Sequence, residues 1–492
     1  MSRIELNRAL YRTDQTRELD RLAIEEFGTP GLLLMERAGR SAFEKILQRF
    51  PGAERVVVMC GPGNNGGDGY VVARLMHQIG VQAVIVRTSE PKTEDAKAVC
   101  EAYLEAGGTI EKDAIAVIAC ADLIVDALLG AGLTRAPAAP FSDLINAANG
   151  NHCACVAIDL PSGLSGDTGH AFDPTIQADC TVTFIGKKLG MYTADGEACC
   201  GDRIYESLDI DPEVYRRVEP AAHILIAPSI APRSANSHKG DYGNLVIAGG
   251  DYGMLGAVLL AGKAALRTGA GLVTIASRER HLDQPALNQP ELMSDVYEQP
   301  SHCKELFQAA DALVIGPGTR ENDWGKILFD TTCQYQLARV IDAGGLRLLA
   351  NSKVKKFDRQ ILTPHPGEAA VLLNTHSIDI QRDRVAAALK ISKQYGGICV
   401  LKGAGTVIAG KGLVRICDRG NPGMASAGMG DVLSGIAGAL LAQGMAPMEA
   451  ACAAVWLHSE SADRATLALS QPSLLATDVI NSLSDVILEC CE

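Results

Sequence analysis

The stretch GPGNNGGDGY, residues 61–70, combines glycines with two asparagines and an aspartate directly after a β-branched run at 55–60. Glycine lets backbone amides approach an anion, and Asn and Asp side chains add donors and acceptors for a polyol or pyrophosphate. The spacing Gly-x-Gly-x-x-Gly also occurs in nicotinamide-dependent dehydrogenases, which place an acidic residue about 20 positions further on for the ribose. Here the next predicted strand ends in Arg87, and Glu90 lies past that end. The stretch therefore favours a site that binds phosphate and hydroxyl groups over one that transfers hydride.

Three further polar residues stand at the ends of apolar strand-like runs in the first half of the chain. Asp126 and Asp159 each end an apolar run, and Lys188 follows a third. A single Asp in such a place is often only the N-cap of the next helix. Two of them together with a lysine indicate a site for proton transfer. Oxygen atoms of Asn65, Asp126 and Ser162 could also converge on a hard cation.

The stretch 420–444 in the second half places Gly428 and Gly430 before an apolar helix that begins near Asp431. Backbone amides at the start of such a helix form an anion hole for a transferring phosphoryl group. Asp431 in that hole can accept the proton of an attacking hydroxyl. The alternative is a helix-packing segment of small residues with an Asp cap, and this motif alone leaves the two interpretations comparable.

Two other stretches favour phosphoryl chemistry. Residues 401–410 read as strand, turn and strand, with Lys402 and a glycine hairpin suited to the phosphates of a nucleotide. Residues 362–373 place His365 and Glu368 between a strand and a helix. A P-loop is excluded, because no Gly-x-x-x-x-Gly-Lys-Ser/Thr occurs in the chain.

Alternating apolar strands and helices must position these residues. Such alternation indicates an α/β protein with parallel sheets, in which ligands bind at the carboxyl ends of the strands. A polar, Pro-rich stretch at 208–236 interrupts the pattern. We therefore predict one domain over 1–215, a linker over 216–235 and a second domain over 236–492. In the first half the predicted strands are 55–60, 81–87, 121–130, 152–163 and 178–186, and the predicted helices are 14–28, 29–50, 69–80 and 94–108.

Composition limits the class of protein. The 492 residues exceed one typical core, and the net charge of −13 argues against binding of nucleic acid. The 15 cysteines include no C-x-x-C pair, so we expect free thiols in a reducing compartment. The polar start and the lack of an 18-residue apolar run predict a soluble, cytoplasmic protein without a membrane partner. A homo-oligomer is expected for a chain of this size.

Roughly residues 10–210 resemble the NAD(P)H-hydrate epimerase family, in the stretches MERAG, GPGNNGGDGYVVAR, VDALLGAGLTR, AIDLPSGLSGDTG and TVTFIGKKLGM. The resemblance implies a Rossmann-like three-layer domain that interconverts the two C6 epimers of hydrated NADH or NADPH. It implies that Asp159 and Lys188 are the catalytic pair and that Asn65, Asp126 and Ser162 hold a potassium ion. The hydrate would contact Asn64, Asn65, Gly66, Gly67, Asp68, Gly130, Ala131, Gly132, Leu133, Thr134, Arg135, Ala136 and Asp159.

Roughly residues 228–492 resemble the ADP-dependent NAD(P)H-hydrate dehydratase family, a branch of the ribokinase-like superfamily. The resemblance lies in SHKGDYGNLVIAGG, GPGTR, LTPHPGEAAVLL, LKGAGTVIAG and GNPGMASAGMGDVLSG. It implies that ADP, with Mg²⁺, phosphorylates the C6 hydroxyl of the S epimer and that phosphate then leaves. The base would be Asp431. The nucleotide would contact Lys402, Gly403, Ala404, Gly405, Thr406 and Gly430, and the hydrate would contact Ala257, Gly318, His365 and Asp431.

Two positions depart from the pattern of this second family. DAGGL (342–346) has Gly344 where a second Asp is common, and Met429 stands where Thr is usual in the anion hole. The first departure affects any metal or solvent role of that position, whereas the second removes a hydroxyl but no backbone amide. We expect activity to survive both.

Two alternative functions stay open at this point. The second half would also suit a small-molecule kinase with a nucleotide-binding regulatory domain attached. A non-catalytic binder of nicotinamide nucleotides is the other alternative, and the intact Asp159, Lys188 and Asp431 argue against it. The choice between NADH and NADPH is likewise open, because Arg87 alone does not decide it.

Overall fold

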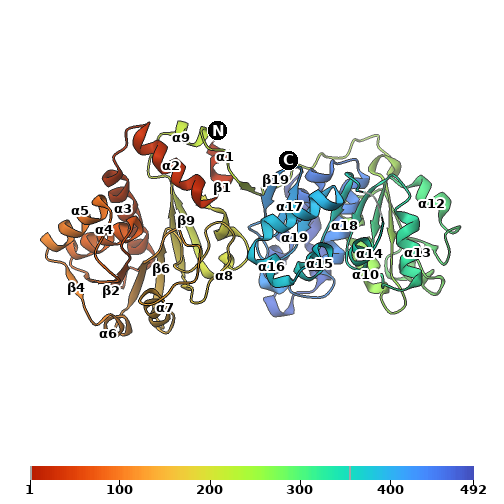
Figure 1. The fold of residues 1–492 in the computed structure, drawn as a ribbon. Coiled ribbons are helices and arrows are strands. Elements are labelled where there is room, and N and C mark those ends of the chain that lie inside the picture. Colours follow the sequence, from red (N-terminus) through yellow and green to blue (C-terminus); the bar gives the residue numbers. More distant parts are fainter. Residues whose placement is uncertain (1–2, 354–355, 492) are drawn as a thin grey trace. The chain divides into compact units, whose positions relative to one another are not determined.

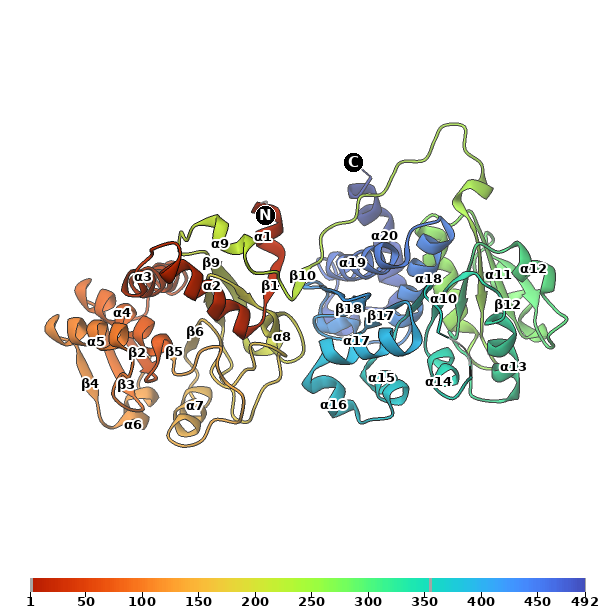
Figure 2. The same ribbon diagram turned by 45° about the horizontal axis from the view of Figure 1, so that its top comes forward.

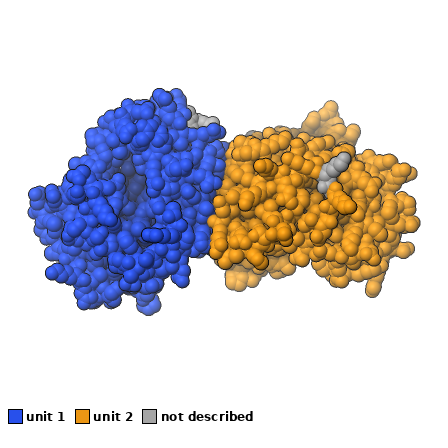
Figure 3. Space-filling view, in the orientation of Figure 1, with its two compact units in different colours: residues 1–223 blue, residues 224–492 orange. Residues whose placement is uncertain are grey.

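The computed structural model describes residues 3–353 and 356–491 (Figure 1). The chain divides into two compact units, Met1–His223 and Ile224–Glu492 (Figure 3). The division falls inside the segment 216–235 that the sequence predicts as a linker. Part of that segment is packed, because Leu225 is buried and its amide donates to the Ile416 carbonyl at 2.9 Å.

The first unit is built on a parallel sheet with the strand order β4-β3-β2-β5-β6-β7-β9. The order reverses between β2 and β5, and open α/β sheets bind ligands at the carboxyl ends of the strands beside such a reversal. In this unit, the residues predicted to do chemistry lie at or just after the carboxyl ends of these strands. The strands are β2 Arg55–Cys60, β3 Gln82–Arg87, β4 Thr109–Glu111, β5 Leu123–Ala127, β6 Ala154–Ile158, β7 Cys180–Phe184 and β9 Asp202–Glu206.

Helices cover both faces of this sheet, which confirms the predicted three-layer, Rossmann-like arrangement. Alternate residues of β2 enter two separate apolar clusters: Val56 and Val58 pack with α3, α4 and α5, whereas Val57 and Met59 pack with α6 and α7. The helices are α1 Arg3–Arg8, α2 Thr13–Glu25, α3 Gly31–Arg49, α4 Asn64–Gln78, α5 Glu94–Glu105, α6 Ala114–Ala119, α7 Phe141–Asn149, α8 Gly196–Cys199 and α9 Pro212–Arg216.

The glycine-rich stretch after β2 differs from its prediction as a loop. α4 begins at Asn64, so the asparagines and Asp68 lie on the first turns of a helix. Glycine disfavours helix interiors by about 1 kcal/mol, but close packing requires it here. A Cβ at Gly69 would lie 2.7 Å from the Ala127 Cβ on β5. Tertiary packing therefore overrides the local propensity.

A small ribbon at the start of the chain was not predicted. β1 Ala9–Tyr11 pairs antiparallel with β10 Ala222–Ile224 and leads into α2 (Figure 2). It also pairs parallel with β8 Lys187–Lys188. The strand is only three residues long, too short for a sequence pattern to reveal.

The second unit contains a sheet with the strand order β13-β12-β11-β14-β15-β16-β17-β18-β19. It is parallel as far as β17, and β17, β18 and β19 are antiparallel, which confirms the predicted strand–turn–strand at 401–410. The strands are β11 Asn244–Ala248, β12 Leu272–Ser277, β13 Met293–Val296, β14 Ala312–Ile315, β15 Ala338–Ile341, β16 Gln360–Leu362, β17 Ile398–Leu401, β18 Val407–Gly410 and β19 Leu413–Ile416.

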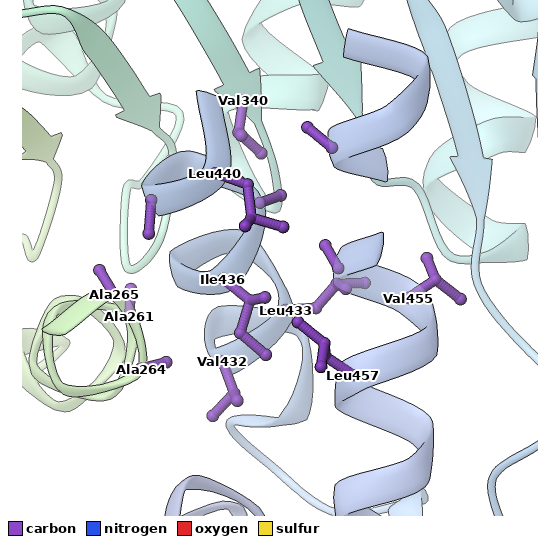
Figure 4. Close-up of a cluster of buried hydrophobic side chains, with 14 of the residues drawn as sticks. Ala261, Ala264, Ala265, Val340, Val432, Leu433, Ile436, Leu440, Val455 and Leu457 are labelled. Carbon is purple, nitrogen blue, oxygen red and sulfur yellow. The ribbon is translucent and has the colours of Figure 1, made fainter. Parts of the chain in front are cut away.

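The apolar helix predicted near Asp431 is α18, Met429–Ala442, at the centre of this unit's core. It lies between α10 Leu255–Arg267 and α19 Pro447–Ala465 (Figure 4). The other helices are α11 Gln284–Asn288, α12 Lys304–Ala309, α13 Asp323–Thr332, α14 Gly344–Ala350, α15 Pro366–Leu373, α16 Ser377–Arg382, α17 Arg384–Tyr395 and α20 Ala476–Glu489.

Small residues on α18 allow this close packing, so the segment is both a packing helix and a candidate site. A Cβ at Gly435 would lie 2.0 Å from the carbonyl oxygen of Ala261 on α10.

We therefore expect Gly435→Ala to lower the free energy of unfolding by about 1–3 kcal/mol, measured by urea denaturation, because the helices must separate. Gly256→Ala on α10 is the matched control. No atom lies within 4 Å of a Cβ there, so stability should be unchanged or rise by up to about 1 kcal/mol. Equal effects of the two substitutions would contradict this account.

All 15 cysteines are free thiols, as predicted. Within residues 3–353 and 356–491, every helix is too short or too polar to cross a membrane.

Candidate active sites

A cavity of about 640 Å³ opens at the carboxyl ends of the strands of the first unit. It collects residues that lie far apart in sequence, and many were predicted as site residues. Those predicted residues are Asn64, Asn65, Asp68, Gly130, Ala131, Gly132, Leu133, Asp159 and Lys188. Gly66 and Gly67 are instead buried within α4, where they pack against other parts of the chain.

Asp159 and Lys188 form an ion pair in this cavity. The Lys188 ammonium donates to Asp159 Oδ1 and also, at 3.1 Å each, to Thr183 Oγ1 and the Phe184 carbonyl oxygen. Lys188 is buried, and Asp159, directly after β6, has a φ of 67°, in the left-handed region that non-glycine residues seldom adopt. Strained backbone of this kind is concentrated at functional sites. The pair is therefore placed for proton transfer.

Asp126 and Ser162 hold two neighbouring loops together. Asp126 is fully buried and accepts hydrogen bonds from the Ser162 amide and hydroxyl, both at 2.7 Å, and from the Leu128 amide at 3.1 Å. The Ser162 hydroxyl oxygen also accepts from the Leu129 amide at 2.9 Å. Burial raises the pKa of Asp126 to about 6, although these hydrogen bonds oppose the shift.

Asn65 lines the same cavity, and both of its side-chain polar atoms are buried without a hydrogen-bond partner. A Cβ at Gly130 would lie 3.4 Å from the Asn65 Cβ and 3.7 Å from Asp159 Oδ2, so the three residues are neighbours. A buried amide left unpaired costs about 1–3 kcal/mol. The amide group is therefore a candidate ligand for an ion or a substrate.

Helix α2 contributes residues that the sequence analysis missed. Thr13, Thr16, Arg17 and Asp20 line the same cavity. The Arg17 guanidinium approaches Gly132 so closely that a Cβ there would lie 2.6 Å from Nη2. No spacing signal marks these residues, because they lie on an ordinary amphipathic helix before the glycine-rich motif.

The second unit brings Lys402, Gly430 and Asp431 together. Lys402 Nζ lies 2.9 Å from Asp342 Oδ1 and 3.8 Å from Glu368 Oε2, and 3.1 Å from the position that a Cβ on Gly430 would occupy. Asp431 lies on the first turn of α18 and is half-buried. Burial raises its pKa to about 7, the carboxylates of Asp342 and Glu368 add to the shift, and Lys402 opposes it. The arrangement combines a base of near-neutral pKa with a cation and helix N-terminal amides.

The two departures from the family pattern have structural explanations. A Cβ at Gly344 would lie 1.9 Å from the carbonyl oxygen of Thr319, so this backbone has no room for a side chain. Asp342 is paired with Lys402, and its Oδ2 accepts from the Ser434 hydroxyl at 2.8 Å. The Met429 side chain is buried in the core of the unit.

His365 caps the start of α15. Its Nδ1 accepts from the Gly367 amide at 3.0 Å, and its own amide donates to Glu368 Oε2 at 2.9 Å. The ring is half-exposed, so the cap leaves one side open to a ligand. The Lys402 amide donates to the Pro364 carbonyl at 2.9 Å, which ties the predicted nucleotide turn to the His365 loop.

The remaining predicted residues of this unit lie on three different segments. Thr406 Oγ1 donates to the Gly403 carbonyl at 2.9 Å and closes the turn between β17 and β18. Gly318 has a φ of 62°, and a Cβ on it would lie 2.5 Å from the Met254 carbonyl oxygen, just before α10. Ala257 lies on the first turn of α10.

Both halves of the chain match known families. Residues 31–190 match a family described as YjeF-related protein N-terminus, and residues 245–485 match one described as NAD(P)H-hydrate dehydratase.

Relatives match over nearly the whole chain. A bifunctional NAD(P)H-hydrate repair enzyme Nnr of Escherichia coli (strain K12) is 40% identical over 490 residues, covering 98% of this chain and 95% of that protein. Its counterpart in Coxiella burnetii (strain RSA 493 / Nine Mile phase I) is 40% identical over 486 residues, covering 96% and 98%. Among solved structures, the hypothetical protein SMU.573 from Streptococcus mutans has 31% identity and a TM-score of 0.50, and the match covers 53% of this chain and 96% of that chain.

Proposed function

The chain belongs to the family of bifunctional NAD(P)H-hydrate repair enzymes, and on that premise we propose which of its residues carry the two reactions. The Rossmann-like first unit is the epimerase domain and the ribokinase-like second unit is the dehydratase domain. The assignment rests on the acid–base groups of the two units. These are the Asp159–Lys188 ion pair in the first unit and Asp431 beside Lys402 in the second.

In the first unit, Asp159 and Lys188 move the protons of epimerisation. The C6 carbon of the hydrate bears both a hydroxyl and the ring nitrogen. When the hydroxyl leaves as water, the nitrogen lone pair forms a C=N bond and C6 becomes planar. Water then adds to either face and loses a proton, which regenerates one epimer or the other. An ionised carboxylate held by a buried lysine suits the proton-accepting step. The hydrate lies along the predicted residues that line the cavity.

We propose that Asn65, Asp126 and Ser162 hold a potassium ion. The unpartnered, buried Asn65 amide supports the fit, because its oxygen lacks any other ligand. Among the described residues, no group of three or more His, Cys, Asp or Glu side chains could hold a metal. The three proposed ligands would supply an amide, a carboxylate and a hydroxyl oxygen, and hard cations take oxygen ligands. The ion would supply positive charge beside the buried Asp126.

Potassium should stabilise the wild-type protein against unfolding. At 10- to 100-fold excess over Kd, we expect K⁺ to add about 1–3 kcal/mol relative to tetramethylammonium at equal ionic strength, measured by thermal denaturation. Asn65→Leu removes the amide oxygen with little change in volume and should abolish the difference. An equal gain from K⁺ in the variant would exclude Asn65 as a ligand.

In the second unit, Asp431 takes the proton of the C6 hydroxyl as that oxygen attacks the β-phosphorus of ADP. AMP leaves, and the C6–O bond of the phosphorylated hydrate then breaks to release phosphate, with loss of a C5 proton restoring NAD(P)H. Phosphate is a far better leaving group than hydroxide. Lys402, Gly430 and the amides of the α18 N-terminus stabilise the transferring phosphoryl group. The turn 402–406 holds the nucleotide, and Ala257, Gly318 and His365 line the hydrate site.

We propose that Mg²⁺ enters this unit with the nucleotide. Asp342 is paired with Lys402 and Ser434, and Gly344 offers no side chain. Mg²⁺ is commonly held by substrate phosphates, waters and one or two carboxylates. The ion would neutralise charge that develops on the phosphates.

One assay tests the assignment as a whole. Mixed epimers of NADH-hydrate, incubated with ADP and Mg²⁺, should be converted completely, with the absorbance of NADH restored. Consumption of the S epimer alone would mean that the first unit does not epimerise. Phosphorylation of a small alcohol without NADH recovery would favour a kinase, and binding without turnover would favour a non-catalytic role.

The remaining expectations stay predictions. They are the domain limits 1–215 and 236–492, which limited proteolysis would check, and a homo-oligomeric state, which light scattering would check. A cytoplasmic location would be checked by cell fractionation.

A further inference from the structure

The short strand β1, near the start of the chain, pairs with β8, the strand that contains Lys188. β1 pairs with β8 in the register Leu10 to Lys187 and Tyr11 to Lys188. α2 begins two residues later, and the Thr13 amide donates to Asp167 Oδ1 at 2.6 Å. The pairing and the hydrogen bond fix where α2 begins relative to the catalytic lysine.

The body of α2 packs on the turn that leads to Lys188. A Cβ at Gly186 would lie 2.9 Å from Thr16 Cγ2 and 3.3 Å from Leu19 Cδ1. The next residue along the helix, Asp20, lines the cavity that holds the Asp159–Lys188 pair. The packing therefore directs Asp20 towards the proton-transfer site.

Asp20 differs from the other acidic residues of α2. The exposed Asp14 accepts from the Gln15 amide at 2.9 Å, and Glu18 and Glu25 pair with Arg21, both at 2.8 Å. Asp20 is half-buried and has no hydrogen bond or ion pair with any residue of the described ranges. A desolvated carboxylate without a partner is costly. Helix capping and salt-bridge formation therefore do not explain why an acidic residue stands at position 20.

Epimerisation at C6 needs a proton donor as well as an acceptor. The hydroxyl leaves as water only if it receives a proton, and the water that adds to the opposite face must give one up. Asp159 is ion-paired with Lys188 and therefore suits the accepting role. A protonated carboxyl group that faces the same cavity would serve as the proton donor.

We propose that Asp20 is the second acid–base residue of the epimerase site, donating a proton to the departing C6 hydroxyl and recovering one in the reverse direction. The C6–O electron pair goes to the oxygen, and the N1 lone pair forms the C=N bond. Asp159 accepts the proton that the incoming water loses, and in the reverse direction Asp159 donates and Asp20 accepts. The inference rests on the epimerase function proposed above.

The surroundings of Asp20 support the donor role. Burial raises its pKa to about 6; the Asp159 carboxylate raises it further and Lys188 lowers it. Asp68 on α4 and Tyr215 on α9 also face this charge, and burial raises the pKa of both. Since the donor works when protonated, the rate of epimerisation should fall as the pH rises through about 6.

The test compares Asp20→Asn with the control Asp14→Asn, an exposed acid on the same helix, in the full-length protein. Interconversion of the separated NADH-hydrate epimers is followed without ADP, and the protein-free rate is subtracted at each pH. Asp20→Asn should slow epimerisation about 10²- to 10⁴-fold and remove the fall near pH 6, with KM little changed. Dehydration of the pure S epimer with ADP should stay at the wild-type rate, because that reaction belongs to the second unit, and a cooperative thermal unfolding transition of the first unit should show that the variant is folded.

Three results separate the possibilities. Epimerisation by Asp20→Asn within threefold of wild type, or with the same pH dependence, would overturn the proposal. Loss of the pH dependence in Asp68→Asn but not in Asp20→Asn would assign the donor to Asp68 and overturn it as well. A wild-type protein that does not epimerise at any pH would refute the proposed epimerase function itself.

Discussion

Asp431→Ala should abolish recovery of NADH while leaving epimerisation intact. The expected loss of dehydration is about 10²- to 10⁴-fold, because the variant has no group at the α18 N-terminus to accept the proton of the attacking hydroxyl. Dehydration is measured as NADH absorbance from the pure S epimer with ADP and Mg²⁺. Epimerisation is measured in the same preparation without ADP.

The matched control is Asp478→Ala, which removes another aspartate from the first turn of a helix in the same unit. Asp478 caps α20 by accepting from the Leu475 amide at 2.9 Å. Its loss should cost about 1 kcal/mol of stability and leave dehydration unchanged. Wild-type NADH recovery by Asp431→Ala, or equal losses in the two variants, would show that Asp431 is not the base of the dehydration.

The environment of Asp431 also predicts a pH dependence. Burial and the neighbouring carboxylates raise its pKa to about 7, and a base works when it is ionised. Dehydration should therefore increase as the pH rises through about 7, the opposite direction from epimerisation. Because the pKa of Asp431 is raised from its usual value of 3.8 to about 7, its protonated carboxyl contributes stability that is fully present below the usual pKa and is lost as the pH rises through about 7.

The strands and the loops that follow them could be predicted because their signals are local. Residues 55–60 were predicted as a strand and form β2 with the same limits. Buried strands of a parallel sheet are continuous apolar runs, and Asp126 and Asp159 stand out at their ends. Parallel strands share one carboxyl edge, so the sequence also indicated which loops would meet.

The parts that were not predicted depend on contacts between distant segments. α4 is helical from Asn64 despite its glycines, and Gly69 packs closely against Ala127 on β5, a contact that helix propensity does not reveal. The placement of Asp20 depends on a three-residue strand, β1, and on the packing of Thr16 against Gly186. Neither feature has a periodicity or a motif.

Asp159→Ala should stop repair at the S fraction of the hydrate. With ADP and Mg²⁺, the S epimer is consumed and the R epimer remains, under conditions in which spontaneous epimerisation is slow. The expected fall in enzymatic epimerisation is about 10²- to 10⁴-fold, since the variant lacks the acceptor held by Lys188. The remaining R epimer is quantified by chromatography after NADH production ends.

Loss of Asp159 has a second consequence that must be separated from catalysis. Lys188 is buried, so removing its partner leaves a buried ammonium with only Thr183 and the Phe184 carbonyl as acceptors, and breaking such a pair costs about 3–5 kcal/mol. Asp159→Ala combined with Lys188→Met removes both charges and should regain much of that stability without regaining epimerisation. If the double variant recovered epimerisation together with stability, the pair would be structural, and the acid–base assignment of Asp159 would fail.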